Sequence, residues 1–331
     1  MFTPYRTSYI DQGSRSAEMS TSASSSTSHS RWVSRRVLLS GTPSSPSEVS
    51  IYYISCKPPL KVESKGTILL IHGFPQTSYQ FRHVITPLSD EGYHVIAPDY
   101  RGAGYSSKPR DGYEKTQMAA DLHELLTEQL GITNKVHVVG HDIGGMVAHA
   151  YASRFPDSTA SIALGECPLP GTQAYDRFCR DVSGVWHFHF HWQTDLPEML
   201  TFGREKEYLQ HFFDRLCVNV SAITPEDVDY YTTMFSKAGA MRAGFDVYRA
   251  FHKDVEENRK WVEEKGKCKV PCISLNGGQS FLVEIAEEQN LEMYETTENA
   301  TVEGAGHYCA EENPTDFIKK VLLWVGKHVS S

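Results

Sequence analysis

An aspartate stands at the centre of a glycine-rich turn in residues 138–145, which read Val-Val-Gly-His-Asp-Ile-Gly-Gly. An apolar β-branched run ends just before Gly140, and a helix-like stretch at 146–155 follows Gly144. A strand, a sharp turn and a helix in this order form a nucleophile elbow, in which glycines permit the strained turn that lifts one side chain out of a sheet. The pattern predicts an α/β fold with Asp142 at the end of a strand. The alternative is an ordinary strand-to-helix turn with an aspartate cap.

The residue type at position 142 decides which chemistry such an elbow performs. A serine would form acyl-enzymes from esters, whereas a carboxylate is a poor acyl acceptor that displaces at an sp³ carbon and forms an alkyl-enzyme ester. Asp142 therefore points to epoxide opening or carbon–halogen cleavage, and it excludes a serine esterase.

Composition and charge exclude several other classes of protein. The net charge of −9, with no basic cluster beyond Arg31, Arg35 and Arg36, argues against a nucleic-acid partner. The seven cysteines are scattered, which favours reduced thiols over a disulfide framework or a zinc site. No apolar run approaches the ~18 residues that span a bilayer, and the N-terminus lacks the apolar core of a secretory signal. We expect a soluble, cytoplasmic protein.

Strand and helix patterns alternate along most of the chain. Buried strands are expected at 67–71, 94–97, 136–139, 161–164, 270–275 and 300–302, and helices at 80–88, 116–130 and 314–328. Two earlier strands are expected at 36–40 and 48–56, joined by a turn at 41–46. Such alternation predicts a mostly parallel sheet with helices on both faces.

Two segments depart from this alternation. Residues 1–30 are rich in Ser, Thr and Ala and are expected to be disordered; a transit peptide is the alternative, against which two acidic residues count. Residues 167–260 are rich in aromatic and charged residues with helical spacing. We expect them to form a helical cap inserted between two parts of the core, 31–166 and 261–331.

Further candidate residues follow other strands at their carboxyl ends, where an open parallel sheet holds its active site. The amides of Phe74 and Ile143 are expected to form an oxyanion hole. His307, on a glycine-rich loop after the last strand, is the candidate base. The loop after 270–275 has no carboxylate, so Glu166, after the 161–164 strand, is the candidate acid and Glu284 the alternative.

These motifs together resemble the α/β-hydrolase fold epoxide hydrolases and the haloacid or haloalkane dehalogenases, from about residue 32 to 328. The matching motifs are His72-Gly73-Phe74, the run Asp-Tyr-Arg-Gly-x-Gly-x-Ser at 99–106, the elbow, and Gly306-His307. The cap regions at 185–188, 212–241 and 245–250 look most like the Cif-type epoxide hydrolases. The resemblance implies an α/β-hydrolase fold: a mostly parallel eight-stranded sheet, flanking helices and an inserted cap.

The resemblance also implies an epoxide hydrolase that needs no cofactor and no metal. Asp142 would open the epoxide and form an alkyl-enzyme ester. Water activated by His307, with Glu166 orienting the imidazole, would hydrolyse that ester to release a vicinal diol.

Cap residues complete the implied site. Carried over by motif, His187 and Tyr248 hold the epoxide oxygen, and His191, Trp186 and Phe188 line the substrate pocket. The better-known epoxide hydrolases use two tyrosines, and the first would fall near His191. A metal site in the histidine-rich stretch 186–192 is disfavoured, because on a helix only His187 and His191 align and no carboxylate or cysteine stands at ligand spacing.

Two alternatives remain beside this interpretation. A haloacid or haloalkane dehalogenase would use the same Asp142, but haloalkane enzymes have tryptophan where Ile143 stands, and fluoroacetate-type enzymes have arginines at Ile143 and Met146. A non-catalytic ligand-binding homologue would have lost a member of the triad, and none is lost if Glu166 is assigned correctly. The expected partner is a small-molecule epoxide, with its identity and homodimer formation left open.

Overall fold

The computed structural model describes residues 31–40 and 48–328. Two expectations lie outside these residues: the segment 1–30 and the turn at 41–46. Every helix in the described ranges is too short or too polar to cross a lipid bilayer.

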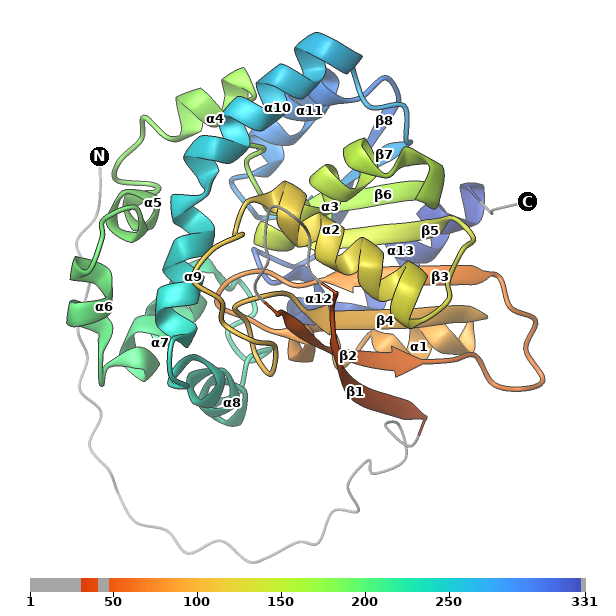
Figure 1. The fold of residues 1–331 in the computed structure, drawn as a ribbon, viewed down its shortest axis with the longest axis horizontal. Helices are drawn as coiled ribbons and strands as arrows, with labels where there is room; N and C mark the ends of the chain where they lie inside the picture. The colour runs from red at the N-terminus through yellow and green to blue at the C-terminus, as the bar shows by residue number, and fades with distance from the viewer. Residues whose placement is uncertain (1–30, 41–47, 329–331) are drawn as a thin grey trace, which may run out of the picture. The chain divides into compact units, whose positions relative to one another are not determined.

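One sheet organises the described residues, and Figure 1 shows it beside the helices that cover it. Its eight strands lie in the order β1-β2-β4-β3-β5-β6-β7-β8. They are β1 (Trp32–Leu38), β2 (Ser50–Cys56), β3 (Gly66–Ile71), β4 (Tyr93–Asp99), β5 (Val136–His141), β6 (Thr159–Gly165), β7 (Cys272–Gly277) and β8 (Thr297–Val302). Only β1–β2 and β2–β4 pair antiparallel. The expected mostly parallel eight-stranded sheet is confirmed.

The central strands are continuous apolar runs because helices cover both faces of the sheet. In β3, Leu69 and Ile71 join the core on one face, whereas Ile68 and Leu70 join the core on the other. The first face is covered by α2 (Lys115–Glu124) with its π-turn Leu125–Gln129, and by α3 (Ile143–Arg154). On the second face lie α1 (Ile85–Asp90) and α13 (Pro314–Lys327), while α11 (Val283–Met293) packs beside β7 and β8.

The expected helix over 80–88 is wrong. The chain forms a 3₁₀ turn at Ser78–Phe81, where the Thr77 side chain caps the N-terminus, and α1 begins separately at Ile85. Pro87 explains the break: proline is tolerated in the first turn of a helix, where its missing N–H costs nothing, but not inside a longer one. The first strand also begins earlier than 36, because Trp32 already pairs with Cys56.

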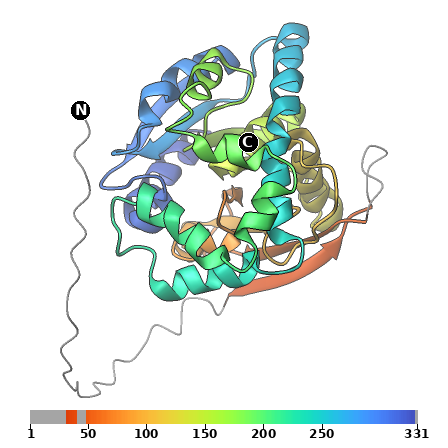
Figure 2. The same cartoon turned by 90° about the vertical axis from the view of Figure 1, so that its left-hand side faces the viewer.

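Helices α4 to α10 lie between β6 and β7 in the chain and gather at one side of the sheet (Figure 1). Figure 2 views the molecule from that side, with α5 to α9 in front of the core. These helices are α4 (Gln173–Phe178), α5 (Trp186–His191), α6 (Leu196–Thr201), α7 (Glu205–Leu216), α8 (Pro225–Phe235), α9 (Ala240–Arg249) and α10 (Phe251–Lys265). We call residues 173–265 the cap.

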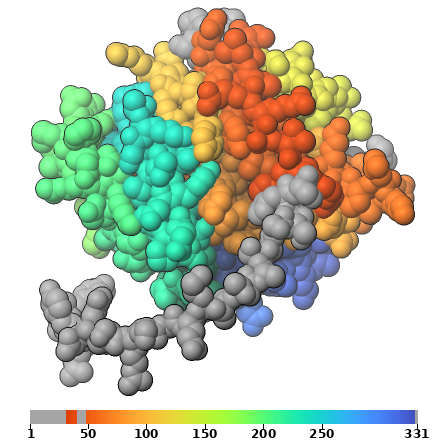
Figure 3. Space-filling view, turned by 90° about the horizontal axis from the view of Figure 1, so that it is seen from below, coloured from red at the N-terminus to blue at the C-terminus, as the bar shows by residue number. Residues whose placement is uncertain are grey.

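Specific contacts fix the cap on the core, and the space-filling view of Figure 3 shows cap atoms (green to cyan) directly against the first part of the core (orange). The Tyr79 hydroxyl donates to Asp227 of α8 at 3.0 Å, and Arg82 pairs with the same carboxylate at 2.9 Å. The ring of Phe74 meets those of Phe212, Phe235 and Tyr248 edge-on at 5.3–5.7 Å. Aromatic packing thus joins the cap to the loop that follows β3.

Candidate active site

Asp142 stands between β5 and α3 with φ 53° and ψ −125°, a backbone conformation that L residues rarely adopt. The turn closes this tightly because Gly140 and Gly144, two residues before and after Asp142, carry no side chain. A Cβ on Gly140 would lie 2.1 Å from the carbonyl oxygen of Gly144, and a Cβ on Gly144 would lie 2.1 Å from that of Ile71. The glycine spacing is therefore a steric requirement, and the strain it permits presents the carboxylate above the sheet.

Two backbone amides hold the Asp142 carboxylate. The Phe74 N–H donates to Oδ1 at 2.8 Å, and the Ile143 N–H also donates to this carboxylate. Gly73 makes the approach possible, since a Cβ there would lie 2.5 Å from that of Asp142. The two amides expected to form an oxyanion hole thus converge on one side chain, and Oδ2 faces His307.

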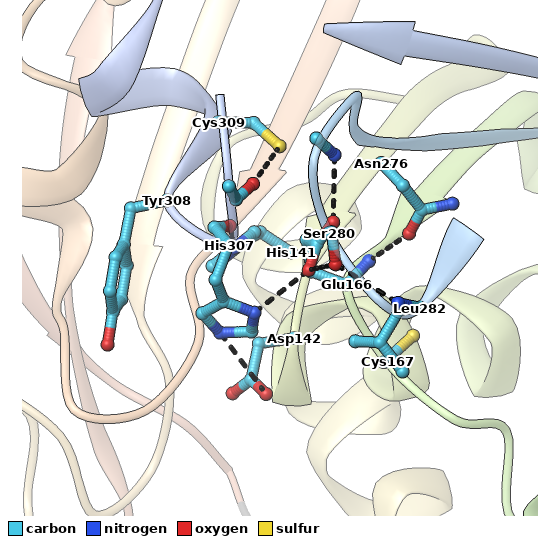
Figure 4. Close-up of polar contacts among 12 residues, drawn as sticks. His141, Asp142, Glu166, Cys167, Asn276, Ser280, Leu282, His307, Tyr308 and Cys309 are labelled. Atoms are coloured by element: carbon cyan, nitrogen blue, oxygen red, sulfur yellow. Dashed lines mark hydrogen bonds and ion pairs between the residues drawn. The ribbon is translucent and has the colours of Figure 1, made fainter. Parts of the chain in front are cut away.

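His307 lies between two carboxylates, as Figure 4 shows. Its Nδ1 is 3.0 Å from Oε2 of Glu166, and its Nε2 is 3.9 Å from Oδ2 of Asp142. Glu166 also accepts hydrogen bonds from the Ser280 hydroxyl and the Gly277 N–H, both at 2.8 Å. The structure therefore brings Asp142, His307 and Glu166 into one chain of contacts.

The loop after β7 supports the acid that it does not itself supply. Asn276 stands in the loop where a carboxylate would be usual, and its Oδ1 accepts a hydrogen bond from the Glu166 N–H at 2.7 Å. The Glu166 backbone has φ 58°. Neither Asn276 nor Ser280 was expected to take part in the site. The sequence feature that could have indicated these two residues is the polar loop that follows a buried strand and lies beside the strand that supplies the candidate acid. Glu284, the alternative acid, is exposed on α11.

Burial and charge shift the acidities of Asp142 and His307. Burial raises the pKa of Asp142 above its ordinary value, although the charge on His307 and the two amides oppose this shift. Burial alone would lower the pKa of His307, but the hydrogen bond and charge of Glu166, together with the charge of Asp142, raise it. The imidazolium form of His307 is therefore stabilised.

The two cap residues expected to hold an epoxide oxygen lie together, with ring centroids of His187 and Tyr248 5.9 Å apart. Burial and the charge of Asp142 raise the pKa of Tyr248 well above its ordinary value, so the phenol stays protonated. Burial lowers the pKa of His187 to about 3, so its imidazole is neutral at pH 7. Within the described ranges, neither the Tyr248 hydroxyl nor the His187 imidazole makes a hydrogen bond, and Nδ1 of His187 is buried.

The remaining cap candidates differ in position. His191 is fully buried, 4.4 Å from the Tyr248 ring centroid, and its Nε2 lies 2.5 Å from the Tyr208 hydroxyl. Phe188 packs against Tyr248 at 5.5 Å. Trp186 lies further out: it lines a surface pocket of about 280 Å³ on the cap, together with Tyr208.

Comparisons of this chain with known sequences and with solved structures agree on its family. The model of the alpha/beta hydrolase fold matches residues 66–180. The soluble epoxide hydrolase of Corynebacterium sp. strain C12 is 34% identical over 262 residues, 77% of this chain and 88% of the relative. The crystal structure of Cfl2 from Burkholderia cenocepacia is 30% identical, with a TM-score of 0.79 over 88% of this chain and 95% of that one. Epoxide hydrolase CorEH is 28% identical, with a TM-score of 0.78 over 89% and 99%. The chain belongs to the epoxide hydrolases of the α/β-hydrolase fold.

Proposed function

We propose that the chain converts a small-molecule epoxide to a vicinal diol through a covalent ester on Asp142. Membership of the family makes it a hydrolase of epoxide ether bonds, and the proposal assigns the residues that do the work. One observation carries that assignment. The Asp142 carboxylate, on a strained elbow, accepts hydrogen bonds from two backbone amides and faces the His307–Glu166 pair. A carboxylate nucleophile, a base and an acid beside that base are the groups that a two-step displacement and hydrolysis needs.

In the first step, Oδ2 of Asp142 attacks an epoxide carbon, and the bond from that carbon to the ring oxygen breaks. Negative charge grows on the oxygen as this bond lengthens. Tyr248 and His187 donate hydrogen bonds to it, and a proton that reaches this oxygen from solvent through the pair completes the new hydroxyl group. Because these donors act mainly on the developing charge, they stabilise the transition state more than bound substrate.

In the second step, Nε2 of His307 takes a proton from a water that attacks Cγ of Asp142. The ester carbonyl oxygen becomes an oxyanion, which the amides of Phe74 and Ile143 stabilise. The intermediate collapses as His307 returns its proton to the departing diol oxygen. One oxygen of the water stays in the Asp142 carboxyl group, which releases a proton to solvent. Glu166 stabilises the imidazolium while it carries the proton.

Replacing His307 by Gln tests this assignment, because the two steps need different residues. The variant keeps Asp142 and the cap donors but has no base, so it should bind one equivalent of a turned-over epoxide and stop. Intact-mass spectrometry should find a gain equal to the whole substrate, and peptide mapping should place it on Asp142. The Asp142→Asn/His307→Gln double variant is the control and should gain no mass.

Other outcomes of this experiment identify the alternatives. Incubated in parallel with a halogenated substrate, a dehalogenase would gain the substrate mass minus the halogen and release halide. An unmodified His307→Gln protein, or a label elsewhere than on Asp142, contradicts the covalent mechanism.

We further infer that the enzyme acts in the cytoplasm without a nucleic-acid partner. The net charge of −9 disfavours binding to polyanions and so supports the absence of a nucleic-acid partner. The free thiols of its cysteines suit a reducing compartment such as the cytoplasm. Light scattering, which measures the molar mass in solution, would determine whether the chain forms a homodimer.

A further inference from the structure

A second buried carboxylate, Glu312, lies close to His307 but has no part in the two steps above. It ends the single-turn helix α12 (Cys309–Glu312) and is 5% exposed. Its oxygens accept hydrogen bonds from four backbone N–H groups: Oε1 from Tyr308 at 2.8 Å, and Oε2 from Gly306 at 3.1 Å, Val218 at 2.7 Å and Asn219 at 2.9 Å.

These four donors belong to two segments that are far apart in the chain. Gly306 and Tyr308 flank His307 directly. Val218 and Asn219 follow α7 of the cap, whose Phe212 ring lies 5.4 Å from that of His187. One carboxylate therefore binds the loop of the candidate base and the end of the cap helix that packs on the candidate oxygen donors.

Two further hydrogen bonds join the same segments. The His307 N–H donates to the carbonyl oxygen of Leu216 at 3.1 Å, and the Asn219 side chain donates to the carbonyl oxygen of Glu312 at 3.2 Å. A Cβ on Gly306 would lie 2.6 Å from the Leu216 oxygen, so the two segments are already at their closest approach. The backbone of the histidine loop has little freedom while Glu312 holds it.

Only a carboxylate suits this position. Both of its oxygens act as acceptors: Oε2 faces three of the N–H donors and Oε1 faces the fourth. A glutamine would have one acceptor oxygen and would point an NH₂ group at backbone N–H groups, which leaves buried donors without partners. The charge also acts on the base itself, since Glu312 is among the groups that raise the pKa of His307.

We propose that Glu312 is a positioning residue, which keeps the His307 loop and the cap end of α7 in register so that Nε2 faces the water attacking the ester. The inference rests on the proposed function for what His307 does. It adds a residue that acts through His307 and leaves the alkylation chemistry to Asp142.

Comparing Glu312→Gln with Glu311→Gln tests the proposal. Glu311 is also buried, 4% exposed, but its carboxylate contacts Arg82, Gln76 and Tyr231 instead of the histidine loop. Rapid-quench assays should find ester hydrolysis slowed on the order of 10²-fold in Glu312→Gln, as expected for a misplaced base, with alkylation changed less than about threefold. Glu312→Asp, which keeps the charge, should recover part of that loss.

Two readouts need no substrate, so they separate this inference from the proposed function. In an NMR titration, the His307 imidazole should titrate at lower pH in Glu312→Gln and as in wild type in Glu311→Gln. In wild-type protein, the four amides bound by Glu312 should exchange with solvent as slowly as those of β5. If the wild-type protein turns over no epoxide, the proposed function is refuted, but the His307 titration and the amide exchange still test the role of Glu312. Rapid exchange of the four amides, an unchanged His307 titration in Glu312→Gln, or equal slowing of both half-reactions overturns the role of Glu312.

Discussion

Replacing Glu166 by Gln tests how far the carboxylate beside His307 stabilises the imidazolium. The carboxylate accepts three hydrogen bonds, at 3.0 Å from His307, 2.8 Å from Ser280 and 2.8 Å from Gly277. An amide removes the charge and has one acceptor oxygen, so it cannot satisfy donors on both sides. The side chain stays similar in size, and the Glu166 backbone bond to Asn276 is unaffected.

The expected loss follows from the distance. Two unit charges 3.0 Å apart interact by about 5 kcal/mol at an effective dielectric constant of about 20. The hydrogen bond that the amide keeps offsets part of this, which leaves about 3 to 5 kcal/mol. Ester hydrolysis, in which the imidazolium forms, should slow by roughly 10²- to 10⁴-fold. Alkylation by Asp142 should change little, because His307 transfers no proton in that step.

The two rates can be measured separately by rapid quench with a single turnover of a good epoxide substrate. The ester should accumulate to nearly one equivalent in Glu166→Gln, because its breakdown becomes limiting. Glu166 raises the pKa of His307, and the base acts only when neutral. The acid limb of the hydrolysis rate should therefore move to lower pH in the variant, even as the plateau falls.

Glu284→Gln is the matched control, since Glu284 has the same charge but is exposed on α11. It should behave as wild type. This role of Glu166 is refuted if Glu166→Gln slows alkylation as much as hydrolysis, or if the acid limb of its hydrolysis rate stays at the wild-type pH.

Two other expectations concern the cap and the core. Tyr248→Phe and His187→Ala should each slow alkylation on the order of 10²-fold, as for loss of an oxyanion donor, and leave hydrolysis nearly unchanged. Alkylation at the wild-type rate in both variants would show that this pair is assigned wrongly, and His191 would be replaced next. Burial lowers the pKa of His149 to about 3, so the folded state holds it neutral while the unfolded chain protonates it below about pH 6.5. Its contribution to stability is present above that pH and falls with acid, by about 2 kcal/mol at pH 5. Thermal unfolding at pH 7 and pH 5 should differ less in His149→Phe than in wild type, and an equal difference would argue against this source of acid sensitivity.

Features carried by a few neighbouring residues were readable from the chain alone. The elbow around Asp142 is such a case, because φ 53° and the 2.1 Å approaches at its glycines are local steric facts that leave a local sequence pattern. The parallel sheet was likewise predictable, since strands covered on both faces must be apolar throughout. His307 stood out among the other histidines by its place after the last strand.

The support of these groups depends on contacts between distant segments. Glu166 meets Ser280 and His307 across 114 and 141 positions of the chain, and Glu312 meets Val218 across 94. No local pattern records such pairings, because strand order and cap docking bring the partners together from distant parts of the chain. The same holds for His191: its spacing on a helix was clear, but only the packed cap joins it to Tyr208. Residue types and local spacing thus indicated the chemistry, whereas long-range packing decided which side chains hold the reacting groups in place.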